Sequence, residues 1–484
     1  MRDNEQQMRI AKINNLLRKE ELNKGDLNSF FEKTSDISFL PIEDHKDVTA
    51  FFCEGMVDTT QLNDHFNNIV AHLMEGLEED KKDLPPIVTV ESIEKVVEMV
   101  FSGYLFFYIN KESHFFAVDI SKIPSRTPEE SKTEISLKGP RDGFTEELNV
   151  NISLIRKRLK TETLHNEQFE IGSLSKTKVS LLYLSNKINT QTLDEIKERL
   201  ETLETESLLS SGQLEQWVSD RTFSIFPHFD YITRADYAIE CLLRGRFIVI
   251  VDGSPSVLIG PINLFAMLKS PEDVHFPYYL VTFQRLIRIL GFMISIFAPG
   301  FYIAITTVNL DQLPFALLAT IVISRQGLPL SLPLEAFFIL ILFEILREAV
   351  IRMPSAVGQT ISIVGGLIIG DAAIRAGLTS PTLLVVIAIS AVATYTLVNQ
   401  SLTGTVTILR IYSMIISLFL GVYGFVLSVL SIIIYLAQLE SFRLSYLEPI
   451  SSLSFRDYLN AFLTNPFKRK DFTSPTIQMR RRRE

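Results

Sequence analysis

Residues 284–438 are a succession of apolar runs with few ionisable side chains, and this stretch limits the folds open to the chain. A helix of about 20 predominantly apolar residues is long enough to cross a lipid bilayer. We expect such spans at about 287–308, 358–376, 381–397 and 408–436. The sequence therefore predicts an α-helical, polytopic membrane domain.

The segment 314–352 does not fit a single simple span. Its first part, 314–324, is too short to cross alone, and a proline-rich stretch follows at 325–333. Irregular backbone is tolerated at membrane depth only where it is buried in protein or lines water. We expect a re-entrant or interfacial structure here. The alternative is two further spans, which also keeps the number of crossings even.

Four charged side chains interrupt the apolar helix predicted at 336–352. Their spacing forms pairs one turn apart, Glu344 with Arg347 and Glu348 with Arg352. A bare charge at the bilayer centre costs roughly 3 kcal/mol on insertion scales, so these side chains have to pair, face protein or lie near the interface. Two interpretations stay open: an interfacial helix with self-satisfied pairs, or a charge network that couples to gating.

The segment 359–376 is rich in small residues, which let helices approach one another closely in lipid. Close helix packing is one interpretation. The other is a pore helix, in which Ile363 or Ile369 forms an apolar constriction that closes by dewetting. The residues expected to face that pore, three or four positions apart, are Gln359, Ser362, Gly366, Ile369 and Ala373.

The remainder of the 484-residue chain is long enough for a large soluble part. The formal net charge of −9 lies largely in that part and argues against a protein that binds nucleic acid. Two cysteines, Cys53 and Cys241, are too few for a disulfide framework. A reducing compartment fits this composition better.

We expect an N-terminal arm over 1–33, followed by two α/β subdomains at 34–125 and 126–275. In each subdomain, two runs of aromatic and β-branched residues flank turn-forming residues. These patterns predict β-hairpins at 103–120 and 247–259. The predicted fold class is therefore a soluble α/β half of two subdomains, followed by the helical membrane domain.

Two pairs of charged residues are candidates for holding the subdomains together. Arg234 and Asp236 are two residues apart, so they would not face each other on one helix, and we interpret them as capping and anchoring residues. Arg141 and Asp142 lie in a predicted tight turn just before a helix. The expected anchoring residues are therefore Arg141, Asp142, Arg234 and Asp236.

The soluble half carries no recognisable enzyme motif. It has no HExxH, paired CxxC, GxSxG or phosphate-binding loop. The seven histidines are scattered, with none beyond His275. We therefore predict a non-enzymatic protein with no metal site and no cofactor.

The distribution of positive charge predicts the orientation in the membrane. Arg285 and Arg288 lie at the start of the first span, and the tail over 439–484 is basic and ends in Arg480–Arg483. By the positive-inside rule both termini are cytoplasmic. The polar N-terminus predicts no signal peptide, and the terminal arginines are suited to attract anionic membrane lipids.

Several motifs occur in order between residues 35 and 465. They are GPRDGFTE (139–146), NISLIRKRL (151–159), GRFIVIVDGSP (245–255), FQRLIRIL (283–290), FEILREAVIRMP (343–354), GQTISIVGG (358–366) and YLEP (446–449). Together they resemble the A subunit of the GerA-type spore germination receptors of endospore-forming bacteria. That family carries a motif near Thr-Glu-Arg-Pro-Asp, of which Arg234 and Asp236 are retained here.

The resemblance implies a nutrient-sensor subunit in the inner membrane of a dormant spore. It implies partnership with a transporter-like B subunit, proposed to bind the germinant, and with a lipoprotein C subunit. It further implies ion release after signalling, with several A subunits forming a ring around the ion path. The alternatives are a scaffold that only holds the B and C subunits together, and a secondary transporter, which would be built from two repeated halves with broken helices.

Overall fold

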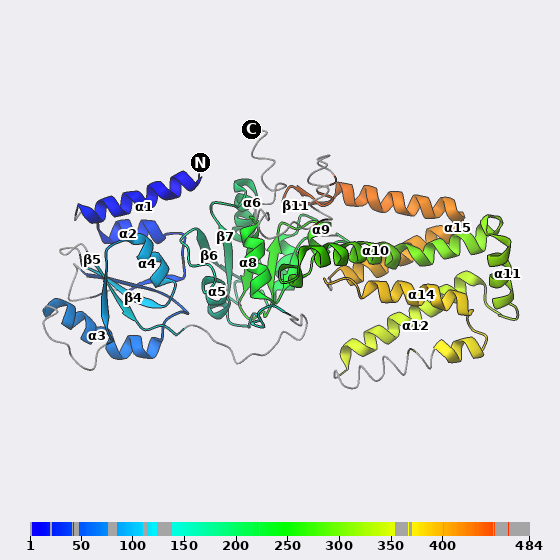
Figure 1. Ribbon diagram of the computed structural model, residues 1–484, viewed down its shortest axis with the longest axis horizontal. Helices are drawn as coiled ribbons and strands as arrows, with labels where there is room; N and C mark the ends of the chain where they lie inside the picture. The colour runs from blue at the N-terminus through cyan, green and yellow to red at the C-terminus, as the bar shows by residue number, and fades with distance from the viewer. Residues whose placement is uncertain are drawn as a thin grey trace.

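The computed structural model describes residues 2–19, 22–40, 42, 48–75, 85–109, 114–122, 138–221, 223–353, 366, 370–399, 401–448, 450 and 463. Its three parts follow one another in a row: two α/β subdomains, each built on its own sheet, and then a domain of helices (Figure 1). This arrangement is the predicted fold class.

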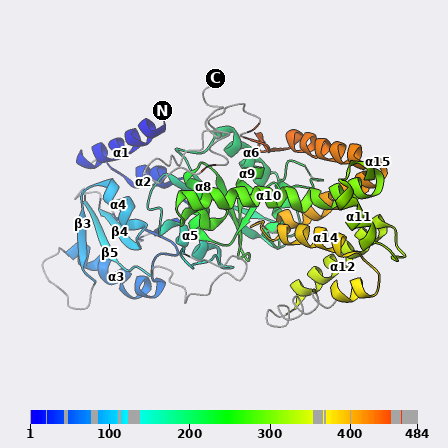
Figure 2. The same cartoon turned by 45° about the vertical axis from the view of Figure 1, so that its right-hand side comes forward.

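The first subdomain is a five-stranded antiparallel sheet with helices on both faces. The strand order is β1-β2-β4-β5-β3, and the strands are β1 (Ile37–Leu40), β2 (Val48–Cys53), β3 (Ile87–Val90), β4 (Tyr104–Ile109) and β5 (His114–Asp119). One face is covered by α1 (Arg2–Arg18), α2 (Lys24–Phe31) and α4 (Ile93–Val100), the other by α3 (Thr59–Glu75). Figure 2 shows the two helical layers on opposite sides. The hairpin predicted at 103–120 is confirmed as the pair β4 and β5.

The second subdomain repeats this plan. Its strand order is β6-β7-β9-β10-β8, and the strands are β6 (Leu164–Ile171), β7 (Thr177–Leu184), β8 (Asp230–Ile232), β9 (Phe247–Val251) and β10 (Val257–Gly260). One face carries α5 (Leu148–Arg156) and α8 (Ala235–Leu243), the other α6 (Thr190–Glu201) and α7 (Ser211–Val218). The hairpin predicted at 247–259 is confirmed, and Gly253 adopts the positive φ of 82° that its turn requires.

Two short helices lead from the second sheet into the helical domain, and a small hairpin follows it. The leading helices are α9 (Leu264–Met267) and the 3₁₀ helix η1 (Pro271–Val274). The domain itself contains α10 (Tyr278–Ile303), the π-helical turn η2 (Ala304–Val308), η3 (Leu310–Gln312), α11 (Phe315–Ser324), α12 (Leu332–Arg352), α14 (Pro381–Thr394) and α15 (Ser401–Gln438). The final hairpin is β11 (Glu440–Ser441) with β12 (Leu444–Ser445).

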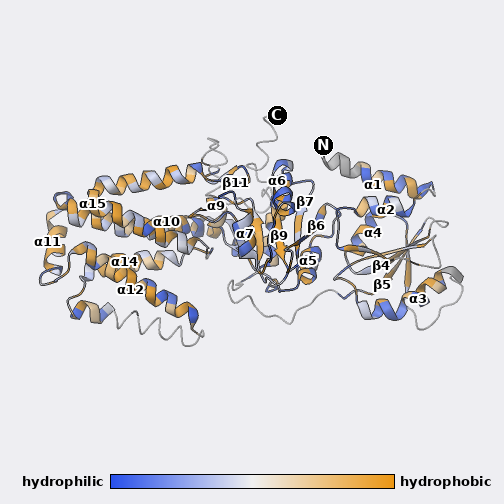
Figure 3. Cartoon of the chain, turned by 180° about the vertical axis from the view of Figure 1, so that it is seen from behind, coloured by the Kyte–Doolittle hydropathy of each residue, from blue (hydrophilic) through white to orange (hydrophobic). Residues whose placement is uncertain are grey.

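Two of these helical segments are long and apolar enough to cross a membrane, namely Tyr278–Val308 and Ser401–Gln438. Hydrophobic residues are spread along the helices of this domain (Figure 3). Helix α10 begins at Tyr278, so the span expected from 287 is the inner part of a longer helix. The segment 314–352 contains the short helix α11 and the longer α12, separated by a proline-containing connection.

Helix α15 is two helices that meet at Gly421. There the backbone has φ 60° and ψ −139°, which is not helical. The hydroxyls of Ser413 and Ser428 lie 3.3 Å apart, whereas 15 residues of straight helix would separate them by about 22 Å. The segment expected as one span over 408–436 therefore folds back on itself as a helical hairpin.

The turn at Gly421 is fixed by its surroundings. The Val422 N–H donates to Oδ1 of Asn309 at 2.9 Å. A Cβ on Gly421 would lie 2.2 Å from the same oxygen and 2.8 Å from Val308. Both the backbone conformation and the space at this position therefore require glycine.

Replacing Gly421 with alanine should lower the free energy of unfolding by about 1–3 kcal/mol, because the new residue is forced into a strained conformation and against Asn309. Thermal unfolding of the full chain in detergent measures this. The matched control is Gly404→Ala in the same element, where no atom lies within 4 Å of the added Cβ and helix propensity favours alanine by up to about 1 kcal/mol. Equal destabilisation by both substitutions would contradict the turn.

Candidate functional site at the junctions between the three parts

A buried ion pair joins the two α/β subdomains. Arg156 at the end of α5 and Asp36 just before β1 have side chains that are 0% and 2% exposed. The guanidinium donates to both carboxylate oxygens, at 2.7 and 3.0 Å, and stacks 4.0 Å from the ring centre of Phe101. Next to this pair, the Ser35 N–H donates to the backbone oxygen of Asn166 at 2.9 Å. A charged pair without water around it holds its partners in one geometry.

The expected anchors Arg141 and Asp142 lie elsewhere. Asp142 pairs with Arg158, at 2.6 Å, and both residues belong to the second subdomain. Arg141 is exposed. Among the described residues, contacts between the subdomains include the pair of Asp36 and Arg156 and the backbone bond from Ser35 to Asn166, neither of which was predicted from the sequence.

Arg234 and Asp236 fasten the second subdomain to η1. The guanidinium of Arg234 donates to the two oxygens of Asp236 at 3.1 and 2.6 Å and also pairs with Glu272 of η1. His275 contacts Asp236 through Nε2 at 2.8 Å. Burial alone would raise the pKa of Asp236, but hydrogen bonds from Arg234 and His275 hold that pKa below its ordinary value.

Arg234 holds the capping position that the sequence predicts, and it meets Asp236 because it lies outside the helix. Arg234 is the N-cap of α8 and has an extended backbone, with φ −107° and ψ 125°. The spacing rule for helical neighbours therefore does not apply to it. Its side chain can fold over the first turn of the helix and reach Asp236.

A second acid of η1 holds the start of α10. The carboxylate of Asp273 is 5% exposed and accepts hydrogen bonds from Arg285 at 3.1 Å and from Arg288 at 2.8 and 3.1 Å. Arg288 also donates to the backbone oxygen of Leu268 at 3.2 Å. Through Glu272 and Asp273, η1 therefore connects α8 on one side with α10 on the other.

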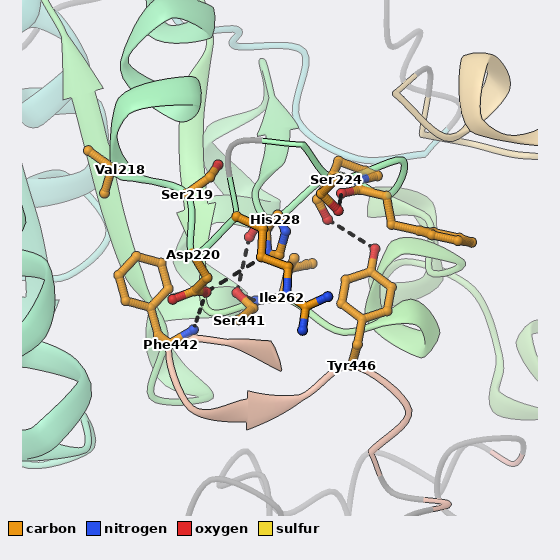
Figure 4. A network of polar contacts seen from close by, with 12 residues as sticks. Val218, Ser219, Asp220, Ser224, His228, Ile262, Ser441, Phe442 and Tyr446 are labelled. Carbon is orange, nitrogen blue, oxygen red and sulfur yellow. Dashed lines mark hydrogen bonds and ion pairs between the residues drawn. The ribbon is translucent and has the colours of Figure 1, made fainter. Parts of the chain in front are cut away.

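The hairpin after α15 returns to the same subdomain (Figure 4). The ring of Phe442 is buried against Phe247 and Phe229, with ring centres 5.1 and 5.5 Å away. Its backbone N–H donates to Asp220 at 2.8 Å, and the hydroxyl of Ser441 donates to the backbone oxygen of His228 at 3.1 Å. The end of the helical domain is thus inserted into the core on the α6 and α7 face of the second sheet.

Tyr446, in the YLEP motif, completes this attachment. It is fully buried, and its hydroxyl donates to the backbone oxygen of Pro227 at 3.0 Å. Its own backbone oxygen accepts from the Leu264 N–H at 3.0 Å, so it also holds the start of α9. The motif was visible in the sequence, but its contacts join residues about 180 or more positions apart.

Inside the helical domain a buried arginine connects four helices. Arg410 on α15 is 2% exposed. It donates to the backbone oxygen of Ser295 on α10 at 2.7 Å and to the hydroxyl of Thr394 on α14 at 2.5 Å. Its guanidinium also lies 3.7 Å from the carboxylate of Glu344 on α12. No sequence pattern identified Arg410, because a single arginine inside an apolar run shows nothing of its partners.

The charged residues expected on α12 form the predicted pairs but lie in two environments. Glu344 pairs with Arg347 at 2.5 Å and is joined to Arg410. Glu348 pairs with Arg352 at 2.6 Å, and these side chains are 61% and 77% exposed. Only the first pair therefore belongs to the four-helix network.

Of the residues expected to face a pore, Gln359, Ser362 and Ile369 lie outside the described residues. Gly366 has no atom of a described residue within 4 Å of an added Cβ and borders an apolar pocket together with Ile339 and Leu384. Ala373 is 5% exposed and packs in the core between α12 and α14. Of the two described positions, Gly366 is the one beside open space.

Two linked α/β subdomains, fastened by buried charges and an inserted aromatic hairpin to a domain of apolar helices, define a membrane-associated protein with a large soluble part. Residues 25–476 match the family model described as Bacillus/Clostridium GerA spore germination protein. The chain belongs to this GerA family.

Known proteins match this chain over most of its length. Spore germination protein XA of Bacillus anthracis is 41% identical over 463 residues, which is 93% of this chain and 94% of that protein. Spore germination protein KA of Bacillus subtilis (strain 168) is 31% identical, covering 88% and 80% of the two chains. The crystal structure of the N-terminal domain of the A subunit of the Bacillus megaterium spore germinant receptor GerK3 is 25% identical, covers 49% of this chain and 93% of that chain, and has a TM-score of 0.36.

Replacing Glu344 with alanine should cost about 3 kcal/mol of unfolding free energy, because it leaves the buried Arg410 without its nearby acid. Glu348→Ala removes an exposed pair on the same helix and should cost less than about 1 kcal/mol. Thermal unfolding of both variants in detergent checks this contrast. A Glu348 variant that is as unstable as the Glu344 variant would show that the network around Arg410 contributes nothing particular.

Acid should weaken the junction of the two subdomains through His165, which lies beside Asn166 on β6. Burial, followed by the charge of Lys33, lowers the pKa of His165 to about 4 from its ordinary 6.5. Between these pH values the unfolded chain binds a proton that the folded chain does not, so stability falls as the pH is lowered. The loss between pH 7 and pH 4 should be about 3 kcal/mol.

Denaturant titrations at several pH values measure this loss. His165→Gln should reduce the change in the free energy of unfolding between pH 7 and pH 4. His114→Gln, at an exposed position, should leave the dependence as in the wild type. If the free energy of unfolding of the His165 variant falls as steeply with decreasing pH as that of the wild type, another group is responsible.

Proposed function

We propose that this chain is the A subunit of a nutrient germinant receptor in the inner membrane of the bacterial spore. Membership of the GerA family and similarity to named spore germination proteins support this assignment. The protein would catalyse no reaction. It would be a non-enzymatic component that responds to germinant and triggers germination. Its partners would be a transporter-like B subunit and a lipoprotein C subunit.

The attachment of the helical domain supports a multi-pass topology with both termini in the cytoplasm. Helix α10 starts beside the second subdomain, held by Asp273, and α15 ends beside the same subdomain, held by Phe442. A helical domain that leaves and re-enters one side of a membrane crosses it an even number of times. The positive charge near both ends agrees with a cytoplasmic location for that side.

We further propose that several copies assemble around an ion path gated by germinant. The observation that carries this proposal is the four-helix network of Arg410, Glu344 and Arg347, because paired charges inside an apolar domain are a feature of membrane pathways and switches. Helix α12, which bears Glu344, leads directly into the small-residue segment 359–376 that we propose as the pore lining. A rearrangement of the charge pairs would thereby reach the pore.

Two other functions compete with the channel. A scaffold would hold the B and C subunits together and conduct nothing, and a secondary transporter would bind its substrate near the membrane midplane. A ring requires several A subunits in each receptor, whereas a scaffold does not.

Ion flux through the purified protein in liposomes, with the B and C subunits and germinant present, tests the channel. Gly366→Leu should remove most of the flux, because a bulky side chain would project into the open space beside that glycine. Gly404→Leu places the same side chain in equally open surroundings on α15 and should conduct like the wild type.

Both variants have to retain the wild-type melting temperature for this comparison. Flux that is insensitive to Gly366→Leu would remove the pore helix from the proposal. A complete absence of flux in the assembled receptor would favour the scaffold.

A further inference from the structure

A pocket between the second subdomain and α10 carries a surplus of positive charge. It lies where the end of α8, the start of β9, the segment between α9 and η1, and α10 come together. Four cationic and two acidic side chains line it: Arg244, Arg246, Lys269, Arg285, Glu240 and Asp273. The contacts between the three parts use only some of these charges.

The two acids of the pocket already have cationic partners. Glu240 pairs with Arg244 one turn along α8. Asp273 is shared by Arg285 and Arg288. Within the part of the chain that the structure describes, Arg246 and Lys269 therefore have no acidic partner.

Arg246 is the clearest sign of a missing ligand. Its side chain lines the pocket and is only 7% exposed. Its Nε is buried and donates no hydrogen bond to any residue that the structure describes. A buried guanidinium N–H that lacks an acceptor is costly.

Lys269 lines the same pocket. Burial, together with the positive charges of Arg244, Arg285 and Arg246, lowers the pKa of its amine well below the ordinary value. A bound anion would oppose each of these electrostatic effects and would give the Nε–H of Arg246 an acceptor. The charges that line the pocket thus favour a group that carries negative charge.

The position of the pocket indicates where such a ligand would come from. Tyr278 and Tyr279 begin α10 and are 47% and 66% exposed. Exposed apolar residues such as Phe283 and Leu290 follow on the same helix. Tyrosines in front of an apolar surface are typical of the boundary between membrane and water, so Arg285, less than two turns further on, lies near the depth of lipid headgroups.

We propose that Arg246 and Lys269 bind a phosphate group at this boundary, carried by an anionic phospholipid or free in solution. The planar donor fork of arginine matches phosphate oxygens, and the lysine ammonium adds a point charge. Basic pockets beside membrane helices on the cytoplasmic side are suited to phosphate headgroups. The site touches α8, η1 and α10 together, so occupancy strengthens the attachment of α10 whether or not the protein conducts ions.

Melting temperatures of the full-length protein in a neutral detergent test the site. The probes are short-chain phosphatidylglycerol, short-chain phosphatidylcholine and inorganic phosphate, each titrated separately. Phosphatidylglycerol should raise the melting temperature saturably, because a ligand that binds only the folded state stabilises it. Phosphatidylcholine carries no net charge and should not produce this shift.

Arg246→Gln and Lys269→Gln should each weaken the apparent affinity for phosphatidylglycerol about tenfold or more, as expected for a lost charge-assisted hydrogen bond. Without the lipid, both variants should be at least as stable as the wild type, since each removes charge repulsion. Arg352→Gln neutralises a cation whose side chain is 77% exposed and should bind like the wild type. If one pocket variant does not fold, the other decides.

Inorganic phosphate that reproduces the shift, and loses it in the same two variants, would support the site and identify free phosphate as its source. A phosphatidylglycerol shift that is unchanged in the pocket variants would overturn the proposal. So would an equal shift with phosphatidylcholine, or no saturable shift with either phosphate-bearing probe.

Discussion

The guanidinium of Arg410 imposes the strongest constraint on the helical domain. A charge among apolar helices is tolerated only where acceptors and an opposite charge are supplied. Here Ser295, Thr394 and Glu344 supply them from α10, α14 and α12. In this conformation the four helices are held in one relative position, because a shift of any of them removes a partner that only another polar group could replace. The hydrophobic surfaces between the helices permit many packings, and the arginine selects one of them.

Buried ion pairs also fix the relative positions of elements in the soluble part and at its junction with α10. The pair of Asp36 and Arg156 aligns two sheets, and Asp273 aligns η1 with α10. The other attachment depends on packing instead, since the ring of Phe442 occupies the core against Phe247. The start of the helical domain is thus held by directional charged contacts and its end by apolar insertion. The first kind depends on opposite charges, whereas the second depends on shape.

Local patterns in the sequence were sufficient for the two predicted hairpins, since turn chemistry and side-chain alternation act between neighbours. They were also sufficient for the two charge pairs on α12. Local patterns could not reveal the pair of Asp36 and Arg156, which are 120 positions apart. They also could not reveal that Arg410 connects four helices. Gly421 looked like any small residue in an apolar run, because its meaning depends on Asn309 more than 100 positions earlier. The contact of Arg234 with Asp236 could not be derived from the spacing rule, since that rule applies only when both residues lie within the helix.

The helical hairpin at Gly421 leaves the helical domain without a free end. Its first helix departs from the second sheet at Asp273, and its last helix returns to the same sheet at Phe442. At the far side, Asn309 ties the end of the first helix to the turn. The two helices and the sheet thus form a closed frame. In such a frame, a twist of the sheet would act on both helices at once, and these helices meet at the corner where Asn309 holds the turn at Gly421.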